Sequence, residues 1–274
     1  MSLMSIRPPY FVPVVASVSL AYIVSIATLE VKPAHPMPIS VSLGVSIASV
    51  TSAALAALLI AFLIRIGRLH VVKAILAFAM AYTSVVSSAM LASRAAPQLP
   101  FPVVAAVGIL IALASLNTGI VGLTGQVALS AIFSNAIIST FGVKLPIALL
   151  AFLSIYDLWS VYRGPIRKLI REVERAYQGS PRREASRSKA PSFAPMVIEV
   201  KEGFIGFGDM ISYALASSVA GRICPTLLSI APLGALLAGV YLSFKIAAKL
   251  KHIPGLPIPI SLWAATAAIV RLLA

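Results

Sequence analysis

Residues 203–213 read GFIGFGDMISY, a glycine-spaced run that leads to Asp209, one of only two aspartates in the chain. Glycines such as Gly206 and Gly208 let another backbone approach closely and permit backbone angles that other residues avoid. Apolar and small residues continue to residue 220, so the segment predicts a membrane helix that contains a carboxyl group. Because inserting an acid at membrane depth costs about 2.5–3.5 kcal/mol, Asp209 is a candidate functional residue.

The composition indicates that the whole chain is membrane protein. Of its 274 residues, 59% are hydrophobic and only 11% are charged, whereas soluble domains are about 45–50% apolar and about 25% charged. A bilayer core about 30 Å thick requires roughly 20 apolar residues per helix, so spans take up most of the length. We therefore predict an all-α integral membrane protein with no separate soluble domain.

Apolar runs, interrupted by charges or by Pro and Gly clusters, predict nine transmembrane helices. They cover residues 11–29, 41–64, 71–92, 101–119, 126–141, 145–162, 204–220, 226–248 and 254–273. The run TGIVGLTG at residues 118–125 separates the fourth and fifth spans in this reading. The predicted organisation is a six-span part at 1–162, a basic loop at 163–203 and a three-span part at 204–274.

The net charge of +14 is explained by topology, without nucleic acid as a partner. Most of the 22 Lys and Arg residues fall on one side if nine spans alternate in direction, and many lie in the 163–203 loop. Cytoplasmic connections are enriched in basic residues. The sequence thus predicts a multi-pass protein of the cell membrane, with the N-terminus and the 163–203 loop in the cytoplasm and the C-terminus outside.

The 163–203 loop has three predicted parts. Apolar and basic residues alternate at helical spacing over Pro165–Tyr177, which is typical of a helix lying in the membrane interface. Residues Gly179–Pro195 are rich in Ser, Pro and Arg and predict a flexible linker. The β-branched run MVIEVK at Met196–Lys201 predicts a short strand just before the seventh span.

Asp157 and Asp209 are the two acids that fall inside predicted spans, since the six glutamates lie in loops. No Lys, Arg or His lies in the middle of a predicted span, so an intramembrane ion pair has no obvious partner. Two neighbouring carboxyl groups share a proton because both cannot ionise easily. One can then activate water as a base while the other protonates or polarises a peptide carbonyl. A catalytic dyad is therefore favoured over a structural role.

Two further features accompany the aspartates. Asp157 follows Tyr156 and precedes Trp159 by two residues, and these aromatic side chains carry polar groups suited to a partly wet cavity. The run PGLPIP at Pro254–Pro259 begins the last predicted span and cannot be regular helix throughout. Non-helical backbone at membrane depth is tolerated where it is buried in protein or lines a water-filled cavity.

Together these motifs resemble the presenilin and signal peptide peptidase family of intramembrane aspartyl proteases, in its compact prokaryotic-type form. The YD, GxGD and PAL motifs of that family match, in order and spacing, Tyr156-Asp157, Gly206-Phe207-Gly208-Asp209 and Pro254-Gly255-Leu256-Pro257. Gly255 stands where the family usually has alanine. The resemblance implies a presenilin-like fold in which Asp157 and Asp209 are catalytic, with water as the nucleophile and no covalent intermediate. It also implies that the other motif residues support the site.

The resemblance further implies transmembrane polypeptides as substrates. In that family the unwound part of a substrate can add as a strand beside the seventh span, by backbone pairing along an edge. The corresponding substrate-binding residues here are Val197, Ile198, Glu199, Val200 and Lys201. The interfacial helix would form part of the gate, and the orientation is that of presenilin. No cofactor is implied, and the sequence makes no prediction of oligomeric state.

Other functions are less well supported by the residues. The three histidines, His35, His70 and His252, lie in separate connections, and Cys224 is the only cysteine, so no metal site is predicted. A prepilin-type peptidase also uses a GxGD motif, but it predicts fewer helices and a basic residue soon after the motif. A proton-coupled transporter could use membrane aspartates and broken helices. A catalytically silent family member that only binds membrane helices is a further alternative.

Overall fold

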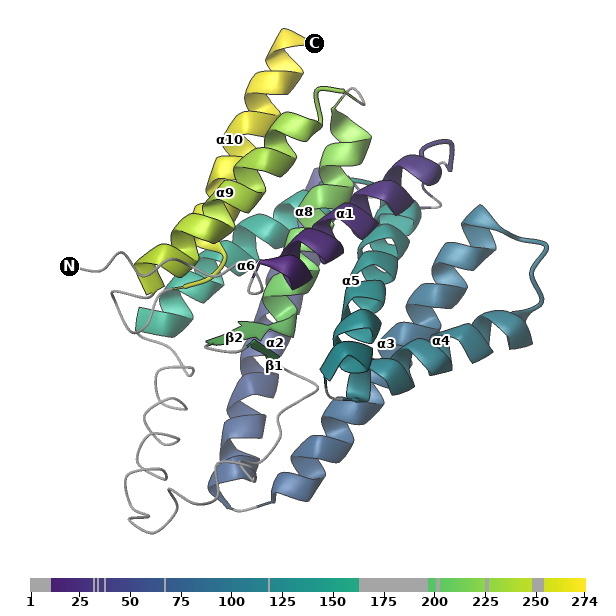
Figure 1. Ribbon diagram of the computed structural model, residues 1–274, viewed down its shortest axis with the longest axis vertical. Coiled ribbons are helices and arrows are strands. Elements are labelled where there is room, and N and C mark those ends of the chain that lie inside the picture. The colour runs from purple at the N-terminus through teal and green to yellow at the C-terminus, as the bar shows by residue number, and fades with distance from the viewer. Residues whose placement is uncertain are drawn as a thin grey trace.

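The computed structural model describes residues 11–31, 33, 35–36, 38–66, 68–117, 119–162, 197–200, 203–224, 227–247 and 254–274. Within these ranges the chain forms nine helices and one two-stranded hairpin (Figure 1). The elements are α1 (Val12–Ala27), α2 (Ile39–Arg65), α3 (Leu69–Ala95), α4 (Phe101–Leu116), α5 (Gly119–Phe141), α6 (Lys144–Tyr162), β1 (Val197–Val200), β2 (Gly203–Gly206), α8 (Phe207–Ile223), α9 (Ile230–Ala247) and α10 (Pro257–Leu273).

Helix α8 lies at the centre of the molecule. It packs against α1, α5, α6, α9 and α10, and Figure 1 shows it between the α9–α10 pair and the helices that lead to α3 and α4. Helices α3 and α4 pack against each other and against α5, while α2 contacts α6 and α3. The buried core accordingly combines residues distant in sequence, such as Val18, Leu150, Met210 and Trp263.

Polar side chains join α1, α5 and α8 where these helices meet. The Ser17 and Ser130 hydroxyls are 2.7 Å apart, and Ser25 Oγ donates to the carbonyl of Ser218 at 2.8 Å. Asn135 Nδ2 donates to the carbonyl of Ala21 at 3.0 Å and to Ser218 Oγ at 3.1 Å. Small residues and interhelical hydrogen bonds are what hold membrane helices together, because lipid is as apolar as a leucine side chain.

The boundary between the fourth and fifth predicted spans was placed wrongly. Helix α4 ends at Leu116, and α5 starts at Gly119, whose φ is +69°, instead of at residue 126. Gly122 and Gly125, which were read as part of the separator, lie inside α5: a Cβ added at Gly125 would lie 2.4 Å from the backbone nitrogen of Ser115 in α4. These glycines allow α4 and α5 to pack closely. They do not break the helix.

The start of the seventh predicted span is also different from the expectation. Residues 203–206 are strand β2, and α8 begins only at Phe207, which leaves Asp209 in the first helical turn. Strand β2 pairs antiparallel with β1, with Val197 opposite Gly206 and Val200 opposite Gly203. The predicted strand at 196–201 is therefore found at Val197–Val200. The predicted interfacial helix Pro165–Tyr177 lies outside the described residues.

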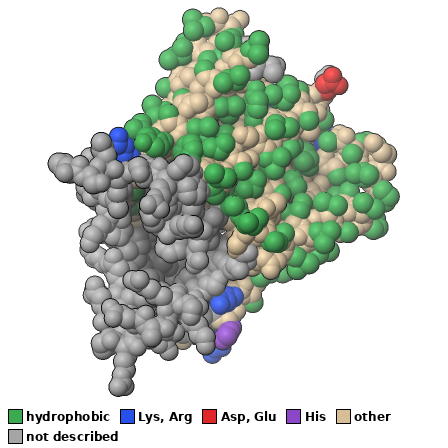
Figure 2. All heavy atoms as spheres, in the orientation of Figure 1, with side chains coloured by type: hydrophobic (Ala, Val, Ile, Leu, Met, Phe, Trp, Pro, Cys, Tyr) green, Lys and Arg blue, Asp and Glu red, His purple; other side chains and the backbone are tan. Residues whose placement is uncertain are grey.

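Five described helices are long and apolar enough to cross a membrane: α2, α3, α5, α6 and α9. Helices α1, α4 and α10 are apolar but shorter, with 16 or 17 residues each. The number of crossings therefore remains a prediction. Figure 2 shows that the described part of one face consists mostly of hydrophobic side chains, backbone and other uncharged side chains, with few Lys, Arg, His, Asp or Glu side chains. Such a surface suits a lipid environment.

Candidate active site

Asp209 lies directly after the point where strand becomes helix. Gly206 has extended backbone angles, φ −66° and ψ 133°, and caps α8, which places Asp209 at the third helical position. A Cβ added at Gly206 would lie 3.4 Å from Asp209 Oδ2, an ordinary van der Waals contact. Around Gly208 a Cβ would meet nothing within 4 Å. The packing thus gives no steric reason for either glycine of the motif.

Asp157 lies on α6, near the end of the helix, and its side chain is partly buried. Its Oδ2 accepts a hydrogen bond of 2.9 Å from the backbone amide of Leu256, and the amide of Gly255 is a second donor to the same carboxyl. The ring of Tyr156 lies 6.2 Å from that of Trp159, centroid to centroid, on the same helix. The first aspartate is therefore held by backbone groups of the segment that precedes α10.

The segment Pro254–Leu256 is not helical, as the sequence predicts, and α10 starts at Pro257. Pro254 and Leu256 are buried, and Leu256 is only 5% exposed. A Cβ added at Gly255 would lie 2.8 Å from Asp209 Oδ2 and 3.2 Å from its Cγ. The segment thus contacts Asp157 on one side and Asp209 on the other, and the two carboxyls interact electrostatically.

This contact gives a physical reason for glycine at position 255. Any side chain there would enter the space that the Asp209 carboxyl occupies, since carbon and oxygen atoms do not approach to 2.8 Å without a bond. The expectation from sequence was that glycine, at a position that is usually alanine in the family, preserves small size but loosens the backbone. In this geometry even a methyl group requires the carboxyl to move.

Comparison of structures, and not of sequences, shows which known proteins this chain is similar to. No protein-family model and no curated protein sequence matches it significantly. A solved structure of a presenilin family intramembrane aspartate protease, in the P2 space group, aligns with a TM-score of 0.57 and 19% identity, over 100% of this chain and 99% of that one. A structure of a presenilin family intramembrane aspartate protease in the C222 space group aligns with a TM-score of 0.57 and 18% identity, over 96% of this chain and 99% of that one. The chain has the presenilin-family fold.

Within this presenilin fold, the predicted substrate-binding strand lies next to the aspartate in the chain. The antiparallel register sets Val197 opposite Gly206, three residues before Asp209. Residues 197–200 form β1, whereas Lys201, the last predicted member of the set, lies outside the described residues. An extended segment that paired with this hairpin would run past the N-terminal end of α8.

Tyr213 was not predicted as a site residue, although it ends the quoted run GFIGFGDMISY. Its hydroxyl donates a 3.0 Å hydrogen bond to the carbonyl of Gly255, and its side chain is 3% exposed. The available signal was its spacing, because residues four apart lie on the same face of a helix and Tyr213 follows Asp209 by four. What it contacts could not be read from that spacing.

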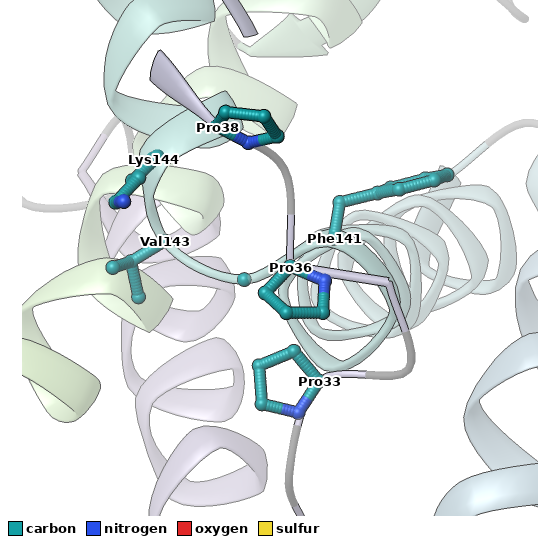
Figure 3. A pocket seen from close by; sticks show the side chains of 7 residues that line it. Pro33, Pro36, Pro38, Phe141, Val143 and Lys144 are labelled. Carbon is teal, nitrogen blue, oxygen red and sulfur yellow. The ribbon is translucent and has the colours of Figure 1, made fainter. Parts of the chain in front are cut away.

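A cavity of about 370 Å³ lies elsewhere in the presenilin fold (Figure 3). Its walls come from the α1–α2 connection and the α5–α6 turn, and it is lined by Pro33, Pro36, Pro38, Phe141, Gly142, Val143 and Lys144. Lys144 precedes Asp157 by 13 positions on α6, a separation of about 20 Å at 1.5 Å per residue. The described residues contain no group of three or more His, Cys, Asp and Glu that could hold a metal ion.

Proposed function

We propose that this protein is an intramembrane aspartic endopeptidase, which hydrolyses peptide bonds of transmembrane-helix substrates. The observation that carries the proposal is the meeting of its two aspartates across one segment: Asp157 accepts the amide of Leu256, and Gly255 contacts the carboxyl of Asp209. These residues come from α6, α8 and the start of α10, which are far apart in sequence. The presenilin-family fold supports the same function.

In the proposed mechanism the two carboxyls share one proton. The ionised carboxyl takes a proton from water as the water oxygen attacks the peptide carbonyl carbon, and the protonated carboxyl donates its proton to the carbonyl oxygen. A tetrahedral diol forms without a covalent bond to the enzyme. In its breakdown the carboxyl that took the water proton protonates the leaving nitrogen, and the other carboxylate takes a proton from a diol hydroxyl. The C–N bond then breaks, and the dyad ends in the state in which it began.

The proposed topology has nine crossings, with the N-terminus in the cytoplasm and the C-terminus outside. Three contacts support the alternation of the spans, because it puts both partners of each contact on the same side; the choice of side rests on the distribution of basic residues. The amide of His35 bonds the carbonyl of Thr140 at 2.8 Å, which joins the first and fifth connections. Arg222, at the end of α8, donates to the carbonyls of Leu29 and Val31 beyond α1. Asp157 and Asp209 then lie toward the cytoplasmic ends of their helices.

The proposed substrate site lies along β1. A substrate helix that unwinds near the cytoplasmic surface could pair its backbone with the edge of Val197–Val200, which satisfies polar groups that lipid cannot. The register of the hairpin brings such a strand toward Asp209. Backbone pairing is tolerant of sequence, so this site would select for an extended, apolar segment more than for particular side chains.

The decisive experiment is cleavage of a labelled single-span peptide by the purified protein in liposomes. Wild type is compared with Asp157→Asn and Asp209→Asn, which keep side-chain shape and remove the acid, and with Glu30→Gln, a change at an exposed loop acid. We expect both aspartate variants to lose at least about 10³-fold in kcat, and the glutamate variant to match wild type. Thermal unfolding of each variant checks that folding is retained.

Two results would refute the proposed protease function. The first is a wild-type protein that cuts nothing across a varied set of single-span substrates. The second is normal cleavage by either aspartate variant, since a shared proton requires both carboxyls. In either case proton-driven uptake into the same liposomes becomes the measurement to make, because membrane aspartates also serve proton-coupled transport.

A further inference from the structure

The peptide bond between Gly255 and Leu256 is held at both of its polar ends. Its carbonyl oxygen belongs to Gly255 and accepts the Tyr213 hydroxyl of α8 at 3.0 Å. Its N–H belongs to Leu256 and donates to Asp157 Oδ2 of α6 at 2.9 Å. None of the described peptide bonds is cis, so these two groups point in opposite directions across one plane. The peptide therefore bridges the two helices that carry the aspartates.

This peptide would turn easily without such contacts. Gly255 has no side chain to limit rotation on its side of the plane. A half-turn of the peptide would replace the Leu256 N–H by the Gly255 carbonyl in front of Asp157, so that two acceptors faced each other. Pro254 and Pro257 fix the chain on either side but have no N–H groups that could hold the peptide by hydrogen bonding.

The Tyr213 ring is well placed to prevent this rotation. It is buried, at 3% exposed, within a core cluster that includes Met210, Leu256 and Ile260. Its backbone is in the middle of α8, four residues after Asp209, so its hydroxyl is a fixed donor. A buried hydroxyl bonded to a carbonyl makes breaking that contact costly.

We propose that Tyr213 is a positioning residue: its hydroxyl fixes the orientation of the Gly255–Leu256 peptide, so that the Leu256 N–H stays on Asp157 Oδ2 and holds that carboxyl in place. Tyr213 acts through the peptide and does not touch substrate. The inference rests on the proposed protease function for its catalytic consequence, whereas the restraint on the peptide holds without it.

The test uses Tyr213→Phe, which removes one oxygen and keeps the buried ring. The matched control is Tyr241→Phe on α9, where the ring is 44% exposed and lies edge-on to Phe11. Amide hydrogen exchange is measured on the fragment 254–259, in which only Gly255, Leu256 and Ile258 have exchangeable amides because the other three residues are prolines. Cleavage kinetics and thermal unfolding are measured on the same samples.

For Tyr213→Phe we expect exchange of the Gly255 and Leu256 amides to become about tenfold faster. We also expect kcat to fall about tenfold with KM unchanged. Both effects correspond to the loss of one hydrogen bond. Tyr241→Phe should change neither. A purely structural role for Tyr213 would lower the unfolding temperature and leave kcat of the folded fraction as in wild type. Unchanged exchange in a folded Tyr213→Phe would overturn the proposal.

Exchange in wild type provides a second test that needs no variant. If the Leu256 amide exchanges as fast as in an unstructured peptide, the restraint does not exist, even if Tyr213→Phe fails to fold. The outcomes also separate the two proposals. Faster exchange in Tyr213→Phe, in a wild-type protein that cuts no substrate, would keep the restraint and reject the protease.

Discussion

Helices α2 and α8 both contain serines and glycine but are opposites in burial. Only 6% of the most apolar stretch of α2 is buried, and side chains such as Leu55 and Phe62 are 62% and 59% exposed. Helix α8, which also contains an aspartate, is mostly enclosed by other helices. Its buried residues are Met210, Ser212, Tyr213, Ala214, Leu215, Ala216, Ser217, Ser218, Val219, Ala220 and Gly221.

The contrast shows which forces place a helix in a membrane. Lipid solvates apolar side chains as well as protein does, so hydrophobicity does not drive α2 into the centre. Hydroxyls of α8 bond carbonyls of α1, whereas hydroxyls of α2 bond carbonyls of their own helix. The carboxyl of Asp209 also avoids lipid at the centre. Helix α8 should therefore respond to small changes of size and polarity that α2 tolerates.

The largest expected effect is overpacking. Ala216 on α8 is 0% exposed, and Ala216→Leu adds three carbons to a filled interior, which should lower the free energy of unfolding by about 3 kcal/mol. The same change at Ala53, exposed on α2, should alter it by no more than about 0.5 kcal/mol. Denaturation in mixed micelles, followed by tryptophan fluorescence, measures both. Equal effects would mean that α8 is not tightly packed.

Next in size is a change beside the carboxyl that α8 carries. Gly255→Ala puts a methyl group 2.8 Å from Asp209 Oδ2, so the carboxyl must move by several tenths of an ångström. We expect kcat to fall about tenfold, since a displacement of 1 Å can cost about a hundredfold. Gly44→Ala on α2, with nothing within 4 Å, is the control. Full activity in Gly255→Ala would show that Asp209 shifts freely, as alanine in the resembling family would suggest.

A smaller effect is expected from the interhelical hydrogen bonds. Ser218 on α8 accepts from Asn135 at 3.1 Å and donates to the carbonyl of Ala21 at 3.3 Å. Ser218→Ala should therefore cost about 1 kcal/mol of unfolding free energy, a typical value for such bonds in membranes. Ser49→Ala on α2 removes a bond only to its own helix, at Val45, and should be neutral. Similar losses in the two variants would contradict the contrast.

The smallest change in unfolding free energy is expected at a matched pair of glycines, one on each helix. A Cβ at Gly221 of α8 would lie 3.0 Å from Ser25 Oγ, which is held by its bond to Ser218, so Gly221→Ala should destabilise by about 0.5 kcal/mol. Gly44→Ala on α2 meets no neighbour and should stabilise by about 0.5 kcal/mol, because alanine favours a helix. The same denaturation assay decides the signs, and identical signs would argue against the assigned packing.

Much of the helix pattern was predictable, because it depends on local runs of apolar residues. The ends of α2, α3, α6 and α9 lie within a few residues of the predicted limits. The errors fall at glycines. Residues 118–125 were read as a separator, although Gly122 and Gly125 lie in α5 against the end of α4. Glycine permits a break and a close contact equally well, and only the facing helix determines which occurs.

The sequence by itself determined that this is a membrane protein with two aspartates in its apolar part and a proline-spaced segment that cannot be regular helix. These conclusions follow from composition and from the cost of burying charge, which are properties of single segments. Only the tertiary structure decided that Gly255 contacts Asp209, that one peptide joins Tyr213 to Asp157, and that α8 is central. Those facts depend on distances between segments far apart in the chain, which helix packing sets and local sequence does not encode.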